Sequence, residues 1–318
     1  MDARSSAPRY HEPALLRETL EVLAVKPGYR MVDATVGDGG HATALLETTA
    51  PDGRLLGIDA DPGALERARA RLAHYGERVT LINDNFANLQ RTVEEHRFQP
   101  LMAVLMDLGL SSWQLEAAGR GFSFRENVPL DMRFSPEQPL RAEEIVNRYP
   151  LEDLARVIAT YGEEPQARRI AASIVRHRPI RTAQELAKTI ESAAPRRGRH
   201  IHPATRTFQA LRIFVNQELE NLEAGLRQAV AVLAKGGRLA VIAYHSLEDR
   251  LVKAFFRQEA RDCLCPPRQP VCTCGHRASV ALVTKRAVRP SKEEVLQNPR
   301  VRSARLRACQ RLAPGGAG

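Results

Sequence analysis

The chain of 318 residues has little of three things: long apolar runs, an apolar N-terminal segment, and cysteine. No run approaches the roughly 20 consecutive apolar residues that a membrane-spanning helix needs. Residues 1–10 are polar and lack the apolar core of a secretory signal peptide. The five cysteines, four of them within residues 263–274, do not form a secreted disulfide framework. These absences predict a cytoplasmic protein with no membrane partner.

Positive charge is abundant but unevenly distributed along the chain, which has a formal net charge of +10. Residues 168–212 carry a net charge of +9 and residues 285–311 carry +7, so the remainder is mildly acidic. Two concentrated basic segments, rich in arginine, indicate a polyanionic partner such as nucleic acid. The alternative interpretation is that both segments are solvated helix surface.

The glycine-rich turn at residues 37–41 lacks the third spaced glycine that is typical of a dinucleotide fingerprint. An apolar strand at 30–34 precedes this turn, a helix follows, and a second strand at 54–59 ends on Asp59. This order predicts a doubly wound α/β nucleotide-binding fold in which Asp59 accepts hydrogen bonds from ribose hydroxyls. Asp59 is alternatively a helix N-cap, although Asp61 is available for that role. Asp33, beside the turn, suits a cationic amine, which favours S-adenosylmethionine over NAD.

The alternation of strands and helices continues and then breaks. Further strands are expected at 79–83 and 101–107, but the next convincing strand is at 238–243. Between them lie helical patterns at 141–148, 151–160, 164–176 and 182–193. Helices without strands, placed between two strands of one sheet, predict an inserted all-helical subdomain. A last strand at 279–285 and a partly extended basic tail after Arg289 are also expected.

The predicted architecture is therefore an α/β protein with two parts. Residues 1–114 and 207–318 are expected to form a discontinuous core, and residues 115–206 a helical insertion. The carboxyl ends of the strands should meet at one ligand-binding edge. This reasoning places the following residues in the cleft: Gly37–His41, Asp59, Asn85, Phe86, Asp107–Leu110 and Tyr244–Ser246.

Two of the cleft residues have competing interpretations. Phe86 is placed either to stack on adenine or to pack in the core. Asp107 ends an apolar strand, where a carboxylate is energetically costly unless it is paired or functional. We therefore expect Asp107 to be either paired or functional, and a functional role is either catalytic or confined to cofactor binding.

Several longer motifs carry a resemblance to a known family. They are DATVGDGGH at 33–41, DLGLSS at 107–112, RGFSF at 120–124, PLDMR at 129–133, HPATRTFQA at 202–210, HSLEDR at 245–250, and NPR with RSA near the end. On these motifs the chain resembles the bacterial 16S rRNA cytosine-N4 methyltransferases. The resemblance extends from about residue 11 to residue 311.

The resemblance implies a class I (Rossmann-like) methyltransferase sheet. It implies transfer of a methyl group from S-adenosyl-L-methionine to N4 of a cytidine in the decoding region of 16S rRNA, with the small ribosomal subunit as partner. Carried over by motif, the cofactor contacts are Gly39, Gly40, His41, Asp59, Phe86, Asp107 and Gln114.

The amine at N4 of cytosine is a poor nucleophile, so a catalyst must accept a proton or a hydrogen bond from it. Asp107 is the candidate acceptor. The candidates for binding the RNA are Asp131, Arg133, Arg206, Gln209, His245 and Ser246. Their alternative role is structural, as salt bridges between the insertion and the core. The insertion itself is the predicted RNA-binding subdomain.

The cysteine-rich loop contains Cys263-x-Cys265 and Cys272-x-Cys274-x-His276. Such a set can hold a structural zinc ion, but C-x-C pairs are weaker evidence for a metal than C-x-x-C pairs. From spacing alone a surface loop of reduced thiols is favoured over a zinc site formed by Cys263, Cys265, Cys272 and Cys274.

Three rival functions share parts of this pattern. An NAD-dependent dehydrogenase would not need the basic insertion, and a small-molecule methyltransferase would not need two basic segments. A non-catalytic RNA-binding module would not need the glycine turn with its downstream acid. The sequence leaves the oligomeric state undetermined.

Overall fold

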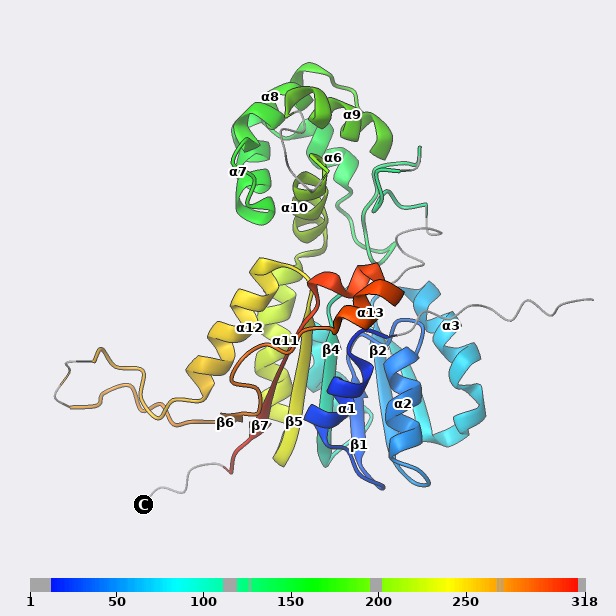
Figure 1. Ribbon diagram of the computed structural model, residues 1–318, viewed down its shortest axis with the longest axis vertical. Helices are drawn as coiled ribbons and strands as arrows, with labels where there is room; N and C mark the ends of the chain where they lie inside the picture. The colour runs from blue at the N-terminus through cyan, green and yellow to red at the C-terminus, as the bar shows by residue number, and fades with distance from the viewer. Residues whose placement is uncertain are drawn as a thin grey trace, which may run out of the picture. The chain divides into compact units, whose positions relative to one another are not determined.

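The computed structural model describes residues 13–110, 119–125, 127–194, 202–267, 269 and 271–313 (Figure 1). The chain divides into two compact units. The sheet unit comprises residues 1–109 and 221–318, and the helical unit comprises residues 110–220. The helical unit thus extends further than the 115–206 expected from sequence. Helix α10 (Thr205–Asn216) belongs to it because Phe208, Leu211 and Val215 pack in the same apolar cluster as the other helices of this unit.

The sheet unit is built on seven strands in the order β3-β2-β1-β4-β5-β7-β6. Strands β1 to β5 are parallel, and β7 runs antiparallel to β5 and β6. The strands are β1 (Arg30–Asp33), β2 (Arg54–Asp59), β3 (Val79–Asn83), β4 (Leu101–Asp107), β5 (Leu233–Ala243), β6 (Val280–Leu282) and β7 (Arg305–Arg311). The predicted α/β class and its Rossmann-like sheet are confirmed.

Strand β7 lies in the tail that was expected to be partly extended, but its pairing within the sheet was not predicted. Leu306, Ala308 and Cys309 are buried against the sheet, while Arg305 and Arg307 contact Asp249 of α12 (Ser246–Glu259) at 2.9 and 2.7 Å. The strand has few apolar residues and several basic ones, so its sequence does not show the apolar pattern of a buried strand. The charge of the basic residues is compensated by an acid that lies far away in the sequence.

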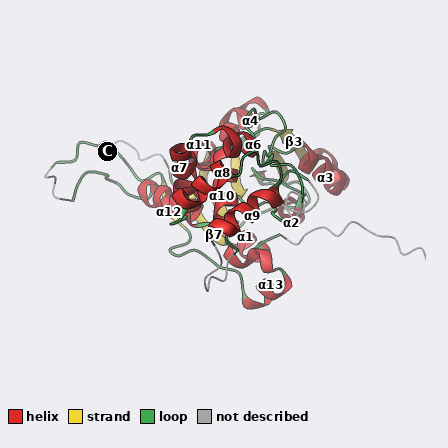
Figure 2. Cartoon of the chain, turned by 90° about the horizontal axis from the view of Figure 1, so that it is seen from above, coloured by secondary structure: helices red, strands yellow, loops and turns green. Residues whose placement is uncertain are grey.

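Helices cover both faces of this sheet, as expected for a doubly wound fold. One apolar cluster packs the sheet against α4, α11 and α12, and another packs it against α1, α2 and α3. Figure 2 shows α4 and α11 on one side, and α1 and α13 on the other. The remaining helices of this unit are α1 (Leu16–Leu23), α2 (Gly40–Thr48), α3 (Pro62–Leu72), α4 (Leu89–Glu95), α11 (Glu218–Val232), α13 (Lys292–Gln297), and the short η1 (Ala73–Arg78), η2 (Phe86–Asn88) and η3 (Pro299–Ser303).

The helical unit has its own apolar core, formed by helices at the predicted positions. Ile145, Leu154, Ile170, Leu186 and Phe208 each come from a different helix and share one cluster. The first four helices are α6 (Ala142–Arg148), α7 (Leu151–Gly162), α8 (Ala167–Arg176) and α9 (Ala183–Ala193). A separate core allows this unit to hold its fold without strands.

Candidate functional site

Three carboxylates stand at the carboxyl ends of three adjacent parallel strands. Asp33 ends β1, Asp59 ends β2 and Asp107 ends β4, and β1 lies between the other two strands in the sheet. Ligands of open α/β sheets bind at this edge. The edge of the sheet unit therefore presents three acids to one region.

Asp59 is held in place by the backbone of the two loops beside it. The N–H of Gly37 donates to its Oδ2 at 2.8 Å, and the N–H of Asp61 donates to its Oδ1 at 2.9 Å. Burial raises the pKa of Asp59 to about 6, against the opposing effect of these two hydrogen bonds. The alternative role considered for Asp59, capping a helix, is filled by its neighbour Asp61. Asp61 is the N-cap of α3 and accepts a hydrogen bond from the N–H of Gly63. Asp59 is thus fixed in orientation while its carboxylate keeps further lone pairs for a ligand.

Asp33 is almost completely buried, with 1% of its surface exposed. Burial raises its pKa to about 8, and the negative charges of Asp107 and Asp59 act in the same direction. The N–H of Thr35 partly offsets this by donating to Oδ1 at 3.3 Å. A carboxyl group in such surroundings gains from a nearby positive charge, which would favour its ionised form.

The carboxyl group of Asp107 lies next to the imidazole of His41 and the hydroxyl of Tyr244. Burial raises its pKa, whereas the hydrogen bond from the Tyr244 hydroxyl and the charge of His41, when that imidazole is protonated, lower it. Its backbone N–H donates to Thr35 Oγ1 at 2.6 Å. Its Oδ1 atom is buried and has no hydrogen-bond partner among the described residues. A buried acceptor without a donor is costly, so this oxygen is suited to receive a hydrogen bond from a ligand.

His41 lies in the first turn of α2 and is buried. Its Nε2 is 3.0 Å from the carbonyl oxygen of Ala14, which can only accept, so Nε2 carries the proton. Its Nδ1 faces Oδ2 of Asp107 at 3.6 Å. Because burial lowers the pKa of His41, the neutral imidazole is favoured.

The glycine turn adopts the conformation that its sequence predicts. Gly37 and Gly39 have φ angles of 51° and 79°, in the left-handed region that favours glycine. A Cβ at Gly40 would lie 2.6 Å from the ring of Pro13. The backbone at Gly40 is therefore closely approached by another residue of the same chain, Pro13.

Phe86 is partly buried and packs with the apolar cluster under the sheet. A Cβ at Gly225 would lie 2.6 Å from its ring, so the side chain rests directly on α11. This contact agrees with the core interpretation for one part of the ring. Stacking of the remainder on adenine stays a prediction.

The predicted RNA-gripping residues of the helical unit are bound to their own unit. Arg133 pairs with Asp131 through Nε and Nη2, each at 2.8 Å, and also donates to the carbonyls of Pro136 and Gln138. Arg206 donates to the carbonyl of Glu163 at 3.0 Å. Gln209 Nε2 donates to the carbonyl of Tyr161 at 3.3 Å. These contacts lie within the helical unit and are not the salt bridges between insertion and core that were the expected alternative, so the RNA-binding role of these residues stays a prediction.

His245 and Ser246 begin α12. His245 is its N-cap: Nδ1 accepts from the N–H of Glu248 at 3.4 Å, and Glu248 Oε2 accepts from the N–H of His245 at 3.2 Å. Ser246 is the first residue of the helix. Gln114, predicted from the resemblance to contact the cofactor, lies outside the described residues.

Two residues at this edge were absent from the predicted contact residues. Asp33 had been predicted only as an acid beside the turn that suits a cationic amine, and Tyr244 only as one of the residues that line the cleft. A Cβ at Gly109 would lie 2.6 Å from the Tyr244 ring. This contact joins β4 to β5 and could not be read from either segment alone.

None of the described helices is both long and apolar enough to cross a membrane.

A model of the MraW methylase family matches residues 9–312. The ribosomal RNA small subunit methyltransferase H of Thermomicrobium roseum is 55% identical over 309 residues, covering 96% of this chain and 95% of the relative. The protein of the same name from Dehalococcoides mccartyi (strain BAV1) is 51% identical over 308 residues, covering 97% of this chain and 88% of the relative. With its nucleotide-binding sheet and its strand-end acids, this chain belongs to the MraW methylase family.

Proposed function

We propose that this protein transfers a methyl group from S-adenosylmethionine to the N4 amine of a specific cytidine in 16S rRNA, within the decoding region of the small ribosomal subunit. Family membership and relatives named as ribosomal RNA methyltransferases support an S-adenosylmethionine-dependent rRNA methylase. The N4 atom and the decoding region are supported by the motif resemblance.

The three strand-end acids are the observation that carries the cofactor assignment. S-adenosylmethionine has a sulfonium, an ammonium and two ribose hydroxyls, and it supplies an electrophilic methyl group when bound. Asp33 and Asp107 are carboxyl groups in buried surroundings, where the ionised form that a cationic ligand favours interacts strongly with that ligand. Asp59, oriented by Gly37 and Asp61, offers lone pairs to the hydroxyls. These residues fit the group.

The chemical role falls to Asp107. The lone pair of the cytosine N4 amine is delocalised into the ring, so the amine becomes nucleophilic only as its hydrogen is accepted. The unpartnered Oδ1 of Asp107 is a buried acceptor at the strand end. The raised pKa makes the ionised carboxylate a stronger base than a solvent-exposed one. We assign the acceptor role to this oxygen, with Tyr244 orienting the carboxylate.

The RNA contacts are proposed for the basic helical unit. Arg206 keeps 43% of its side chain exposed while its Nη1 is bound to Glu163, so it can also meet a phosphate. Arg133 is 13% exposed and its donors are occupied. We therefore propose that Arg206 and Gln209 contact the RNA. We propose that Asp131 and Arg133 instead shape the loop next to the bound RNA. His245 and Ser246 fix the start of α12 next to Tyr244. The target base must leave its stack to reach Asp107.

The test is methylation of small ribosomal subunits isolated from a strain that lacks this enzyme. Labelled S-adenosylmethionine is added, and the nucleosides of the 16S rRNA are identified by mass spectrometry. One new N4-methylated cytidine is the expected product. Label on naked RNA or on a small molecule, but not on subunits, would contradict the ribosomal assignment and leave the methylase assignment standing.

A further inference from the structure

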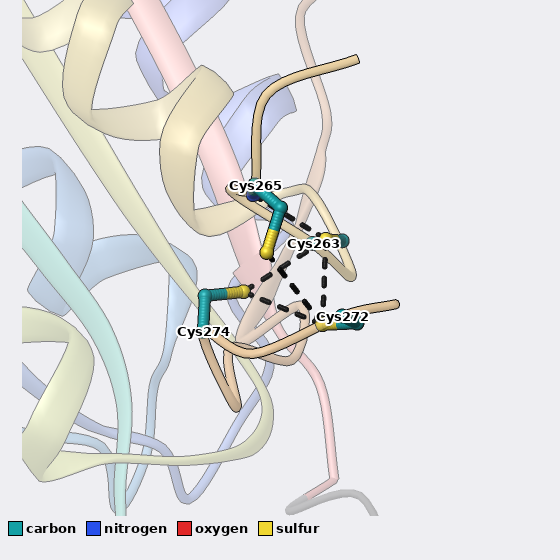
Figure 3. A group of neighbouring side chains, drawn as sticks. All are labelled: Cys263, Cys265, Cys272 and Cys274. Atoms are coloured by element: carbon teal, nitrogen blue, oxygen red, sulfur yellow. Dashed lines mark hydrogen bonds between the residues drawn. The ribbon is translucent and has the colours of Figure 1, made fainter. Parts of the chain in front are cut away.

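The loop between α12 and β6 brings four cysteine thiols together. The Sγ atoms of Cys263, Cys265, Cys272 and Cys274 all lie within 4.8 Å of one another. Figure 3 shows the four side chains, which come from two strands of the loop and point toward a common centre. The sequence alone favoured a loop of reduced thiols, because nothing in C-x-C spacing requires two such pairs to meet.

The distances match those between the ligands of a tetrahedral metal ion. The Sγ of Cys272 is 3.5 Å from that of Cys263, 4.0 Å from that of Cys265 and 3.6 Å from that of Cys274. The Sγ of Cys263 is 3.8 Å from that of Cys274. Four sulfurs at about 2.3 Å from a zinc ion lie about 3.8 Å apart. All four cysteines are free rather than disulfide-bonded.

Backbone amides support the sulfurs from outside the cluster. The N–H groups of Leu264, Cys265 and Thr273 donate to the sulfurs of Cys274, Cys263 and Cys265, at 3.3, 3.4 and 3.4 Å. Such donors stabilise negative charge on a thiolate, which is the form that binds metal. His276 is engaged elsewhere, since its Nε2 is 3.1 Å from the carbonyl oxygen of Gln258. The ligand set is therefore four sulfurs.

The loop buries little apolar surface that could hold its shape. Leu264 and Val271, its large apolar side chains, are 39% and 69% exposed. The cysteines themselves are exposed or only partly buried. A segment that buries so little apolar surface does not offset the entropy of ordering its backbone. A metal ion cross-linking its two strands supplies the missing stabilisation.

We propose that Cys263, Cys265, Cys272 and Cys274 bind one zinc ion as a closed structural site. Soft thiolates in a tetrahedral arrangement select zinc over hard cations. Four protein ligands leave no open position for catalysis. The ion holds the loop at the end of α12 remote from Tyr244 and the strand-end acids.

The experiment measures metal in the full-length protein, purified under reducing conditions and dialysed without chelator. Plasma mass spectrometry is expected to find about one zinc per chain. After chelation, added cobalt(II) should give the intense visible absorption of a tetrahedral thiolate site. The Cys272→Ser and Cys274→Ser variants should each lose at least about tenfold in zinc affinity. The matched control is Cys309→Ala, which removes the buried fifth cysteine and should keep one zinc.

Folding is monitored separately, so that a loss of metal is not mistaken for unfolding. Trypsin should cut at Arg261 or Arg277 at least about tenfold faster after chelation, while the affinity for S-adenosylmethionine stays within about twofold. Three results would overturn the proposal. They are wild-type protein with four verified thiols that binds no zinc at micromolar concentration, zinc binding that survives both serine variants, and disulfides among these cysteines in protein alkylated directly in the cell extract.

Discussion

The three carboxylates at the strand ends have electrostatic surroundings opposite to those of Asp131 and Asp249, two carboxylates that pair with arginines. Burial raises the pKa of Asp33, Asp59 and Asp107. In contrast, at Asp131 and Asp249 the effect of burial is outweighed by hydrogen bonds and charges from arginines, which together lower the pKa of both carboxyl groups. The first group lies at the sheet edge where ligands bind, and the second group joins segments of its own unit.

This difference distinguishes acids that already have a cationic partner within the protein from acids whose cationic partner would be a ligand. Asp131 and Asp249 already have cationic partners, Arg133 for one and Arg305 with Arg307 for the other. The strand-end acids have backbone donors and His41, whose neutral form is favoured. An acid kept without a cation inside a protein costs stability, and a cationic ligand removes that cost. Each prediction below perturbs one member of the two groups.

The largest effect is expected at Asp107. Asp107→Asn removes the proposed acceptor while keeping the size of the side chain, so kcat should fall by about 10²- to 10⁴-fold. Steady-state methylation of small subunits, with both substrates saturating, measures kcat, and single-turnover methylation shows whether the chemical step is the one affected. The comparison variant Asp249→Asn should be less stable but should keep its turnover. Near-normal kcat in Asp107→Asn would remove this residue from catalysis.

At Arg133 the expected change is in stability. Arg133→Ala leaves Asp131 without its bidentate partner and frees two carbonyl acceptors, at a cost of about 2 kcal/mol in the free energy of unfolding. Urea unfolding followed by circular dichroism measures it, and the affinity for S-adenosylmethionine should not change. An unaltered stability would show that the pair is not structural.

Asp59 should affect cofactor affinity specifically. Asp59→Asn replaces a carboxylate acceptor with an amide, and the Kd for S-adenosylmethionine should rise roughly tenfold or more, as expected for one lost charge-assisted hydrogen bond. Calorimetric titration gives the Kd. Its neighbour provides the control, because Asp61→Ala removes the N-cap of α3 and should cost about 1 kcal/mol of stability. Equal losses of affinity in both variants would argue for a purely structural Asp59.

The smallest effect is the pH dependence set by Asp33. Its pKa is about 8 in the free protein against a reference value of 3.8, so the folded state favours the protonated form. This contribution to stability is present below about pH 4 and is lost as the pH rises through about 8. A cationic ligand binds the ionised form, so its affinity should increase over the same rise and binding should release a proton.

Calorimetry of S-adenosylmethionine binding between pH 6.5 and 8.5, in buffers of different ionisation enthalpy, measures both the affinity and the proton release. The change in Kd should be roughly tenfold, and Asp33→Asn should abolish it. The same pH dependence in the Asp33→Asn variant would assign it to another group.

The sequence determined the order of strands and helices because hydrophobic periodicity and glycine punctuation are local signals. Strands β2, β3 and β4 lie where they were predicted. The strand-end rule also placed Asp59 and Asp107 at the ligand-binding edge, since parallel strands align their carboxyl ends. The motif resemblance singled out His41, already placed in the cleft by the strand-end rule, as a cofactor contact.

Tertiary structure decided what depends on contacts between distant segments. Strand β7 forms where the tail pairs with β5 and β6 and where Arg305 and Arg307 contact Asp249. The helical unit includes α10 because of its packing. Tyr244 reaches Asp107 only once β4 and β5 are paired. The four thiols meet only when their loop folds back on itself. Local patterns describe which groups a segment carries, but partner choice and burial, which set pKa and ligand preference, arise when the chain is packed.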